Sequence, residues 1–588
     1  MYDIKICGGM VIDGSGNQPF MADVAIVQDK IVAIGKTLGP AKQEISATGC
    51  IVTPGFVDIH THYDGQVNWT QQLAPSTDHG VTTVVMGNCA VGIAPCKADQ
   101  RDLLINIMGG VEDIPEVVMA EGLPWNWETY PEYLDALAQR ECDADFASMI
   151  AHGPLRLFVM GQRGADRESA TGEDLVKIAA VVKEAIEAGA IGFSTSRTLI
   201  HRSVDGKLAP AETASEEELM TIAKAMRDAR AKSVLQYISD FPGLTIGGSA
   251  DFDLMCRFAK TAGLPLSFTL VEVPGYPEGW RQILHMIEHA NQSGLRIRGQ
   301  VAPRAIGLSF GLDLSYHPFT FRKSYREIAH LPLAERVVRM KDPELRARIL
   351  SEPSVSIKGE TVGLFSQVVT AVEQMFRLEN PPNYEPAPQQ SLQMRAKAKG
   401  MPAEAFAYDE LLEDGGHAIL YFPITNYRTG SLDQVEEMMR HPDTVVALGD
   451  GGAHYGLISD ASYPTFALTH WVRDRDGSRF TLEEMIRALT RVPAETVCLS
   501  DRGLLQVGYK ADVNIINMET LALGYPQVFY DLPAGGRRMT QFATGYVATI
   551  VSGQVTRMNG ESTGIYSGRL VRGTRADPGI NALHAQSA

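Results

Sequence analysis

Two histidines, His60 and His62, follow the apolar run Phe-Val-Asp-Ile. Side chains at positions i and i+2 of a β-strand point to the same face, so this spacing predicts two imidazoles at one point near the carboxyl end of a strand. Imidazole nitrogens are common zinc ligands, and the pair predicts part of a metal site. The alternative is two polar loop histidines. The preceding turn Pro54-Gly55, together with Asp58, favours the metal site.

Two further residues could complete such a site. Cys89 follows the apolar run Val-Thr-Thr-Val-Val-Met, and a thiolate is a strong zinc ligand. Asp450 stands in the glycine-rich segment Leu-Gly-Asp-Gly-Gly. Its carboxylate could bind a metal and accept a proton from water, which is the general-base role that hydrolysis requires. A buried apolar cysteine and an ordinary turn aspartate are the alternatives.

Other polar side chains lie at or soon after predicted strand ends, where they could contact a substrate. They are His152, Arg156, Arg197, His201, Gln236, Arg304 and His454. Arg197 or Arg304 could pair with a substrate carboxylate. His454 could orient a leaving group or complete the metal shell. Each taken alone also has a structural interpretation. His285 and His289 share one helix face, and we expect them to be solvated or packed.

The elements that would position these residues alternate between apolar strands and amphipathic helices. The predicted strands are residues 56–62, 81–89, 146–152, 190–195, 233–238, 265–273, 296–302 and 444–450. Ser215-x-x-Glu218 and Thr481-x-x-Glu484 are capping-box patterns that predict helix starts. Eight strands with helical crossovers predict an α/β fold, a (β/α)8 TIM-like barrel, whose catalytic groups collect at the carboxyl ends of the strands.

Outside this alternation the sequence predicts a small domain and an insertion. Short β-rich runs in residues 1–53 and matching runs in residues 501–588 predict a β-sandwich built from both termini, and residues 54–500 form the barrel. Residues 308–416 break the rhythm before the last barrel strand. We expect a lid or specificity element there, because insertions at this face cover the active site. A contact between copies of the chain, giving a homo-oligomer, is the alternative.

Composition limits the partners. The 588 residues carry a net charge of −17, from 53 Lys and Arg against 70 Asp and Glu, and this argues against nucleic acid and anionic membranes. The N-terminus begins directly with strand-like alternation and shows no apolar signal core, so we expect a cytoplasmic protein. The seven cysteines show no paired pattern, and we expect thiols.

Several motifs together resemble the amidohydrolase superfamily, and within it the N-acyl-D-amino-acid deacylases, or D-aminoacylases. They are Pro-Gly-Phe-Val-Asp-x-His-Thr-His, Gly-Asn-Cys, Ala-His-Gly-x-Leu-Arg, Gly-Phe-Ser-Thr-Ser and Leu-Gly-Asp-Gly. The resemblance implies a zinc-dependent hydrolase that cleaves the C–N amide bond of an N-acyl amino acid or related small amide by a metal-activated water. It also implies that His60, His62, Cys89 and Asp450 hold the metal.

The sequence departs from this family at two strand ends. Metal-binding histidines are expected on strands five and six, where this chain has Gln236 and Thr269. Neither side chain is a good zinc ligand, so we expect one metal per subunit rather than two. Two alternatives stay open. One is a lactone, cyclic amide or ester hydrolase on the same scaffold, and the other is a metal-poor relative without catalytic activity.

Overall fold

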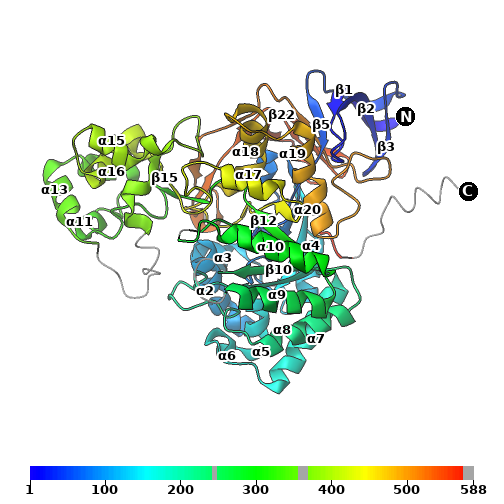
Figure 1. Ribbon diagram of the computed structural model, residues 1–588, viewed down its shortest axis with the longest axis horizontal. Helices are drawn as coiled ribbons and strands as arrows, with labels where there is room; N and C mark the ends of the chain where they lie inside the picture. The colour runs from blue at the N-terminus through cyan, green and yellow to red at the C-terminus, as the bar shows by residue number, and fades with distance from the viewer. Residues whose placement is uncertain (241–247, 274, 355–367, 574–588) are drawn as a thin grey trace, which may run out of the picture.

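The centre of the computed structural model, which describes residues 1–240, 248–273, 275–354 and 368–573, is an eight-stranded parallel sheet (Figure 1). Its strands run in the order β16-β12-β11-β10-β9-β8-β7-β6. They are β6 (Phe56–Asp58), β7 (Val81–Met86), β8 (Asp145–Ala151), β9 (Gly192–Arg197), β10 (Val234–Ser239), β11 (Leu266–Thr269), β12 (Ile297–Val301) and β16 (Thr444–Val446). The expected α/β fold of eight parallel strands is present and its curled sheet is TIM-like, but among the described residues no pairing of β6 with β16 closes it into a ring.

The two outer members of this sheet order meet through the loops that follow them. The Asp450 N–H donates to the His60 carbonyl at 3.1 Å, and the His62 N–H donates to the Gly451 carbonyl at 2.8 Å. Strands β6 and β16 end earlier than predicted, at Asp58 and Val446. His60, His62 and Asp450 therefore lie on loops beyond the strands, and their position depends on these loop contacts.

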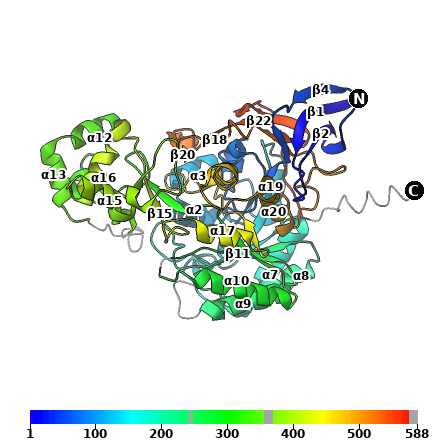
Figure 2. The same cartoon turned by 45° about the horizontal axis from the view of Figure 1, so that its top comes forward.

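Helices connect the strands and surround the sheet (Figures 1 and 2). The main ones are α2 (Arg101–Glu112), α4 (Tyr130–Ala138), α5 (His152–Met160), α7 (Gly172–Ala188), α8 (Glu216–Asp228), α9 (Gly248–Ala262), α10 (Gly279–Gln292), α17 (Asp433–Arg440), α19 (Leu482–Leu489) and α20 (Arg491–Thr496). Every residue of β7 and β8 is buried, as expected for parallel strands that are covered on both faces.

The two predicted capping boxes have different outcomes. At α19, the Thr481 hydroxyl accepts from the Glu484 N–H at 3.3 Å and the Glu484 carboxylate accepts from the Thr481 N–H at 2.8 Å, so this box is confirmed. At α8, Ser215 caps the helix, but the Glu218 carboxylate does not return to it. That carboxylate contacts His152 at 2.8 Å and Arg156 at 2.6 Å instead, because both side chains are buried beside it.

A second, nine-stranded sheet draws strands from both ends of the chain. It contains β1 (Tyr2–Val11), β2 (Phe20–Val27), β3 (Lys30–Gly35), β4 (Ala41–Ser46), β5 (Ile51–Pro54), β17 (Val513–Ile516), β22 (Tyr546–Val551), β23 (Gln554–Met558) and β24 (Glu561–Ser562). Strand β5 pairs with β1 on one side and β17 on the other, and so joins the two termini. The division into a β-sandwich of residues 1–53 and 501–588 stays a prediction, and residues 574–588 lie outside the described residues.

Within the β-rich residues 501–588, the run 548–555 has the pattern of a single strand, but the structure divides it into two. The chain turns at Ser552-Gly553, where both residues have positive φ, and this turn separates β22 from β23. Positive φ at both central residues is typical of the tight turn that fits the twist of a hairpin. A side chain at Gly553 would also collide with the Gln28 carbonyl.

The insertion between β12 and β16 forms a lobe, residues 307–423, that lies to one side of the barrel (Figures 1 and 2). Its elements are β13 (Gly307–Phe310), α11 (Lys323–Arg326), α12 (Leu333–Met340), α13 (Pro343–Ser351), β14 (Phe376–Arg377), α15 (Leu392–Ala398), α16 (Ala403–Leu411) and β15 (Leu420–Pro423). The lobe has its own hydrophobic core, which includes Phe310, Phe319, Tyr408 and Leu420. Leu457 joins that core from the segment after Asp450, so the lobe packs on the chain that leaves the site.

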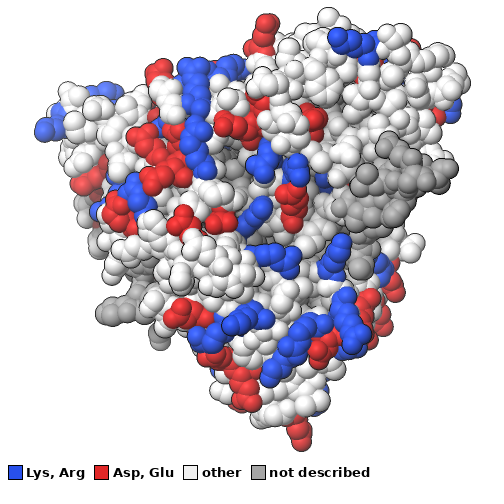
Figure 3. Space-filling view, turned by 45° about the vertical axis from the view of Figure 1, so that its right-hand side comes forward, with Lys and Arg blue, Asp and Glu red and all other residues white. Residues whose placement is uncertain are grey.

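The surface carries both signs of charge. Figure 3 shows Lys and Arg side chains interspersed with Asp and Glu over one face. None of the described helices is long and apolar enough to cross a bilayer. All seven cysteines are free thiols in the structure.

Candidate metal centre

His60 and His62 are brought together by the loop after β6. Thr61, between them, donates its N–H to the Val85 carbonyl at 3.0 Å and its hydroxyl to the same oxygen at 2.8 Å. This pair of bonds holds the loop along β7, so the two flanking imidazoles face the same region with ring centroids 5.5 Å apart. Both histidines are about 1% exposed. The convergence predicted from their spacing is present, although a loop rather than a strand produces it.

Cys89 joins the histidines from the loop after β7. Its Sγ lies 3.2 Å from Nε2 of His60. Among the described residues, donor atoms of His60, His62 and Cys89 all lie within 4.8 Å of one another. Cys89 has a φ of +56°, a conformation that is costly for a non-glycine residue and is found where the surroundings demand it. Its N–H donates to Oε1 of Gln236 at 3.2 Å, which helps to hold this conformation.

Asp450 faces the histidines from the loop after β16. Its Oδ1 lies 3.5 Å from Nε2 of His60 and 3.6 Å from Nε2 of His62. The residue before it, Gly449, packs on the buried Asp58, and a side chain at this position would collide with that carboxylate. The Asp450 side chain is 15% exposed, whereas both histidines are almost fully buried, so solvent reaches the cluster from the carboxylate side.

Burial and neighbouring charges act differently on the groups of the cluster. Burial lowers the pKa of His60 to about 4, and its imidazole is therefore neutral, as a metal ligand must be. Burial raises the pKa of the Cys89 thiol to about 12. Burial opposes ionisation of Asp450 as well, but the hydrogen bond from His62 and the charges of the neighbouring histidines together outweigh it and hold the pKa of Asp450 below its usual value. A cation that binds here displaces protons from its ligands, so its affinity depends on pH.

Two side chains hold the outer nitrogens of the histidines. Nδ1 of His60 lies 2.7 Å from Oε1 of Gln300, on β12, and the Gln300 amide donates to Ser267 at 2.8 Å. Nδ1 of His62 lies 3.4 Å from Oε1 of Glu112, at the end of α2. Burial raises the pKa of Glu112 to about 7. The sequence analysis missed both residues. Gln300 carried one signal, an amide near the carboxyl end of a predicted strand, but Glu112 carried none that distinguishes it from other acidic residues.

Two predicted substrate residues have other partners. His152 is fully buried, with Nδ1 2.9 Å from Thr195 and Nε2 2.8 Å from Glu218, so both ring nitrogens are engaged. Arg304 is buried against Asp460, with Nη2 2.6 Å from the carboxylate, and its guanidinium lies over the Tyr384 ring at 3.9 Å. These contacts engage both ring nitrogens of His152 and the guanidinium of Arg304 with protein partners, and a contact of either residue with substrate stays a prediction.

The remaining predicted substrate residues differ in their surroundings. Arg197 pairs with Asp251 at 3.1 Å and also donates to the Ala214 carbonyl, which leaves it unsuited to a two-pronged contact with a substrate carboxylate. Burial and the nearby charges of His62 and His454 lower the pKa of His201 to about 3. His454 is 20% exposed and lies beside Glu112. His201, Gln236 and His454 therefore border the cluster.

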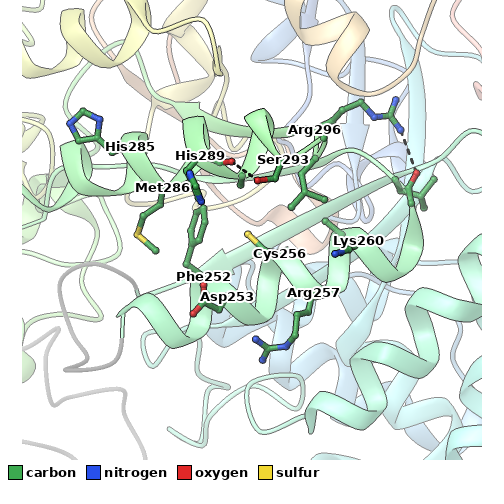
Figure 4. A pocket seen from close by; sticks show the side chains of 16 residues that line it. Phe252, Asp253, Cys256, Arg257, Lys260, His285, Met286, His289, Ser293 and Arg296 are labelled. Carbon is green, nitrogen blue, oxygen red and sulfur yellow. Dashed lines mark hydrogen bonds between the residues drawn. The ribbon is translucent and has the colours of Figure 1, made fainter.

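A separate groove lies between the outer helices α9 and α10, with a volume of about 780 Å³ (Figure 4). Cys256, Arg257, His285, His289 and Arg296 are among its lining residues. His285 is largely exposed and its Nδ1 lies 3.2 Å from Glu288. The walls of this groove are the outer helices of the barrel, whereas the candidate metal ligands lie at the carboxyl ends of the strands. The solvated role expected for His285 agrees with this position.

Comparisons with known proteins support a common origin for the whole chain. A model of the amidohydrolase family matches residues 43–557. A D-aminoacylase from Alcaligenes xylosoxydans xylosoxydans is 24% identical over 580 residues, which are 98% of each chain. A solved D-aminoacylase with a binuclear metal center superposes with a TM-score of 0.65 at 21% identity, covering 97% of this chain and 100% of the other.

A third relative is also a deacylase of an N-acyl-D-amino acid by its name. An N-acyl-D-glutamate deacylase from Bordetella bronchiseptica, solved with zinc and a phosphonate inhibitor, superposes with a TM-score of 0.64 at 22% identity. It is matched over 97% of this chain and 99% of its own. The resemblance inferred from the motifs is confirmed. This chain belongs to the amidohydrolase family, whose D-aminoacylase-like members are hydrolases of carbon–nitrogen bonds other than peptide bonds.

Proposed function

We propose that the chain hydrolyses the amide bond of an N-acyl amino acid with one zinc ion held by His60, His62, Cys89 and Asp450. The observation that carries this proposal is the convergence of four donor side chains, from three separate barrel loops, on one point. Two imidazoles, a thiol and a carboxylate match the ligand types that zinc prefers. The names of the D-aminoacylase and N-acyl-D-glutamate deacylase relatives support acylated D-amino acids as the substrate class.

The residues present fit one metal better than two. Gln236 uses its carbonyl oxygen on the Cys89 N–H, and the Thr269 hydroxyl is buried without a hydrogen-bond partner among the described residues. Neither offers an imidazole where a second metal needs one. A D-aminoacylase relative with a binuclear center shows one-metal activation and second-metal attenuation, which is consistent with a single metal being sufficient.

A bound zinc ion would supply Lewis-acid polarisation of the scissile carbonyl and lower the pKa of water at the site toward 7. Asp450 is placed to act as the general base and then the general acid. Its carboxylate is the part of the donor set that solvent reaches, so it can accept a proton from the attacking water and pass it to the leaving amine. His454, which is partly exposed and follows Asp450 closely, is the candidate to orient the leaving group.

The lobe of residues 307–423 is proposed as the element that shapes substrate entry. The lobe follows the carboxyl end of β12, the edge of the sheet on which the donor loops lie, and leads on to α17. The Ser309 N–H donates to the Leu457 carbonyl at 2.7 Å, which ties the lobe to the segment after His454. A contact between copies of the chain is the competing role for this lobe.

The test is turnover of a panel of N-acetyl-D- and N-acetyl-L-amino acids by zinc-loaded protein and its variants. We expect His60→Ala and His62→Ala to abolish hydrolysis, and Asp450→Asn to lower kcat about 10²- to 10⁴-fold through loss of the general base. His285→Ala, on an outer helix, is the matched control and should retain full activity. Near-normal turnover by Asp450→Asn would contradict the mechanism, and hydrolysis of lactones or esters alone would contradict the substrate class.

A further inference from the structure

The Glu112 carboxylate lies between two imidazoles of the candidate site. Its Oε1 is 3.4 Å from Nδ1 of His62, and its Oε2 is 3.4 Å from Nε2 of His454. The side chain is 1% exposed. Within the described residues, neither carboxylate oxygen has a hydrogen bond of normal geometry, and neither does Nδ1 of His62. The two oxygens of Glu112 and Nδ1 of His62 therefore face each other and His454 without another protein partner among these residues.

This position is unfavourable for an acidic residue considered by itself. Glu112 is the last residue of α2, where the helix dipole is negative and repels a carboxylate. Its own carbonyl already accepts the His454 N–H at 2.5 Å, which fixes the helix end against the loop after β16. A buried carboxylate at a helix C-terminus is costly unless proton donors face it. Here His62 and His454 are the donors that can do so.

The other histidine of the pair shows the same arrangement. Nδ1 of His60 is held by Gln300 at 2.7 Å, which leaves Nε2 directed at Cys89 and Asp450. Nε2 of His62 is likewise directed at Asp450, and its Nδ1 faces Glu112. Metal-ligating histidines usually donate their second ring N–H to a carboxylate, carbonyl or water, which fixes the tautomer and the ring orientation.

We propose that Glu112 is a positioning residue for the metal centre. Its Oε1 accepts the Nδ1–H of His62 and so leaves Nε2 of that ring unprotonated for the metal, while Oε2 fixes the ring of His454 at the solvent side. This inference rests on the proposed metal site, since it assigns the outer partner of one of its ligands. Glu112 itself does not bind the metal in this arrangement.

The experiment compares zinc affinity, measured by competition with a chelating dye, in the unmodified protein and three variants. Glu112→Gln keeps the shape and one acceptor but removes the charge, and Glu112→Leu removes both. We expect zinc affinity to fall 10- to 100-fold for Gln, as is typical when such a partner is lost, and further for Leu. Glu218→Gln is the matched control: it is also a buried glutamate that contacts a histidine, but it should leave zinc affinity unchanged.

A second readout separates positioning from simple structural support. In chelator-treated protein, Glu112→Gln should unfold at about the same urea concentration as the unmodified chain, because the amide oxygen can still accept the Nδ1–H of His62 and no buried charge has to be desolvated. A structural role would lower that concentration in parallel with zinc affinity. The visible spectrum of the cobalt-substituted protein should keep its shape in Glu112→Gln, since the ligands are unchanged.

Three outcomes would overturn the inference: equal zinc affinity of Glu112→Gln and the unmodified chain, an altered cobalt spectrum that makes Glu112 a ligand, or a parallel loss of stability. The failure of the proposed function looks different. If the unmodified chain itself binds no zinc, the proposed metal site is wrong. Equally tight zinc binding by the unmodified chain and by Glu112→Gln refutes only the role of Glu112.

Discussion

Asp450 touches His60 in two ways: its backbone N–H donates to the His60 carbonyl at 3.1 Å, and its Oδ1 lies 3.5 Å from the His60 Nε2. The two residues follow β6 and β16, the outer members of the parallel sheet order. A metal held by both side chains would link the loops after β6 and β16, which the backbone hydrogen bond already joins. Metal binding and closure of the barrel should therefore be linked.

Zinc should raise the thermal midpoint of unfolding, because a ligand that binds only the folded state stabilises it. At a free zinc concentration of about 100 Kd the gain is about 2.7 kcal/mol. Differential scanning calorimetry with zinc and with a chelator measures the shift. His62→Ala should show a much smaller shift. An equal shift in both proteins would mean that zinc stabilises the chain from another site.

Cys89→Ala should weaken zinc binding strongly, because the Sγ that lies 3.2 Å from Nε2 of His60 is lost. The loss of stability in metal-free protein should be only on the order of 1 kcal/mol, the cost of a small cavity. Cys142→Ala is the control, since Cys142 is also buried but lies just before β8, at the amino end of the strands. Zinc titration of the two variants decides the matter: equal affinities would show that Cys89 is only a packed side chain.

Replacing Gln236 and Thr269 together by histidine should raise zinc content from about one toward two ions per chain. Gln236 already contacts Cys89, and Thr269 is the register partner of Gln300 on the next strand, so both new imidazoles would border the site. We expect no matching gain in native activity. Elemental analysis after dialysis gives the stoichiometry, with exposed Gln43→His as control for adventitious binding. Two tightly held ions in the unmodified chain would contradict this prediction.

His317, in the lobe core, should make the protein sensitive to mild acid. It is 2% exposed and its Nδ1 accepts the Phe319 N–H at 3.2 Å, which requires a neutral ring. Burial, together with the positive charge of Arg336, lowers its pKa to about 3 from an ordinary value of 6.5. Below pH 6.5 the unfolded chain takes up a proton that the folded chain does not. The stabilisation is therefore complete above pH 6.5 and is lost progressively down to about pH 3.

The expected loss is roughly 1.4 kcal/mol per pH unit, or about 2 kcal/mol between pH 6.5 and 5. His317→Asn should reduce this dependence, since the amide oxygen can accept the same N–H two residues on without titrating. Urea unfolding at pH 7.5 and 5.0 measures the pH dependence of the free energy of unfolding. His285→Asn, at an exposed helix position, should leave this dependence unchanged. An undiminished acid loss in His317→Asn would assign the effect to other buried histidines.

The sequence by itself indicated the fold class and the four candidate donors, for one physical reason. Apolar runs of strand length, separated by helical patterns, predict parallel strands, and the carboxyl ends of parallel strands meet at one edge. Polar residues that directly follow such runs are therefore brought together whatever the details of packing. His60, His62, Cys89 and Asp450 all satisfy this condition, and the structure places them side by side.

Only the tertiary structure decided which other polar residues reach the cluster. His152 and Arg304 also follow strands, but buried partners, Glu218 and Asp460, hold them elsewhere. Glu112 follows no strand, and it arrives because a helix end packs against the loop after β16. Burial, ion pairing and the packing of a helix end against a distant loop depend on the three-dimensional surroundings of each side chain. Local pattern in the sequence does not encode these surroundings, so the partners of the donors could be assigned only from the fold.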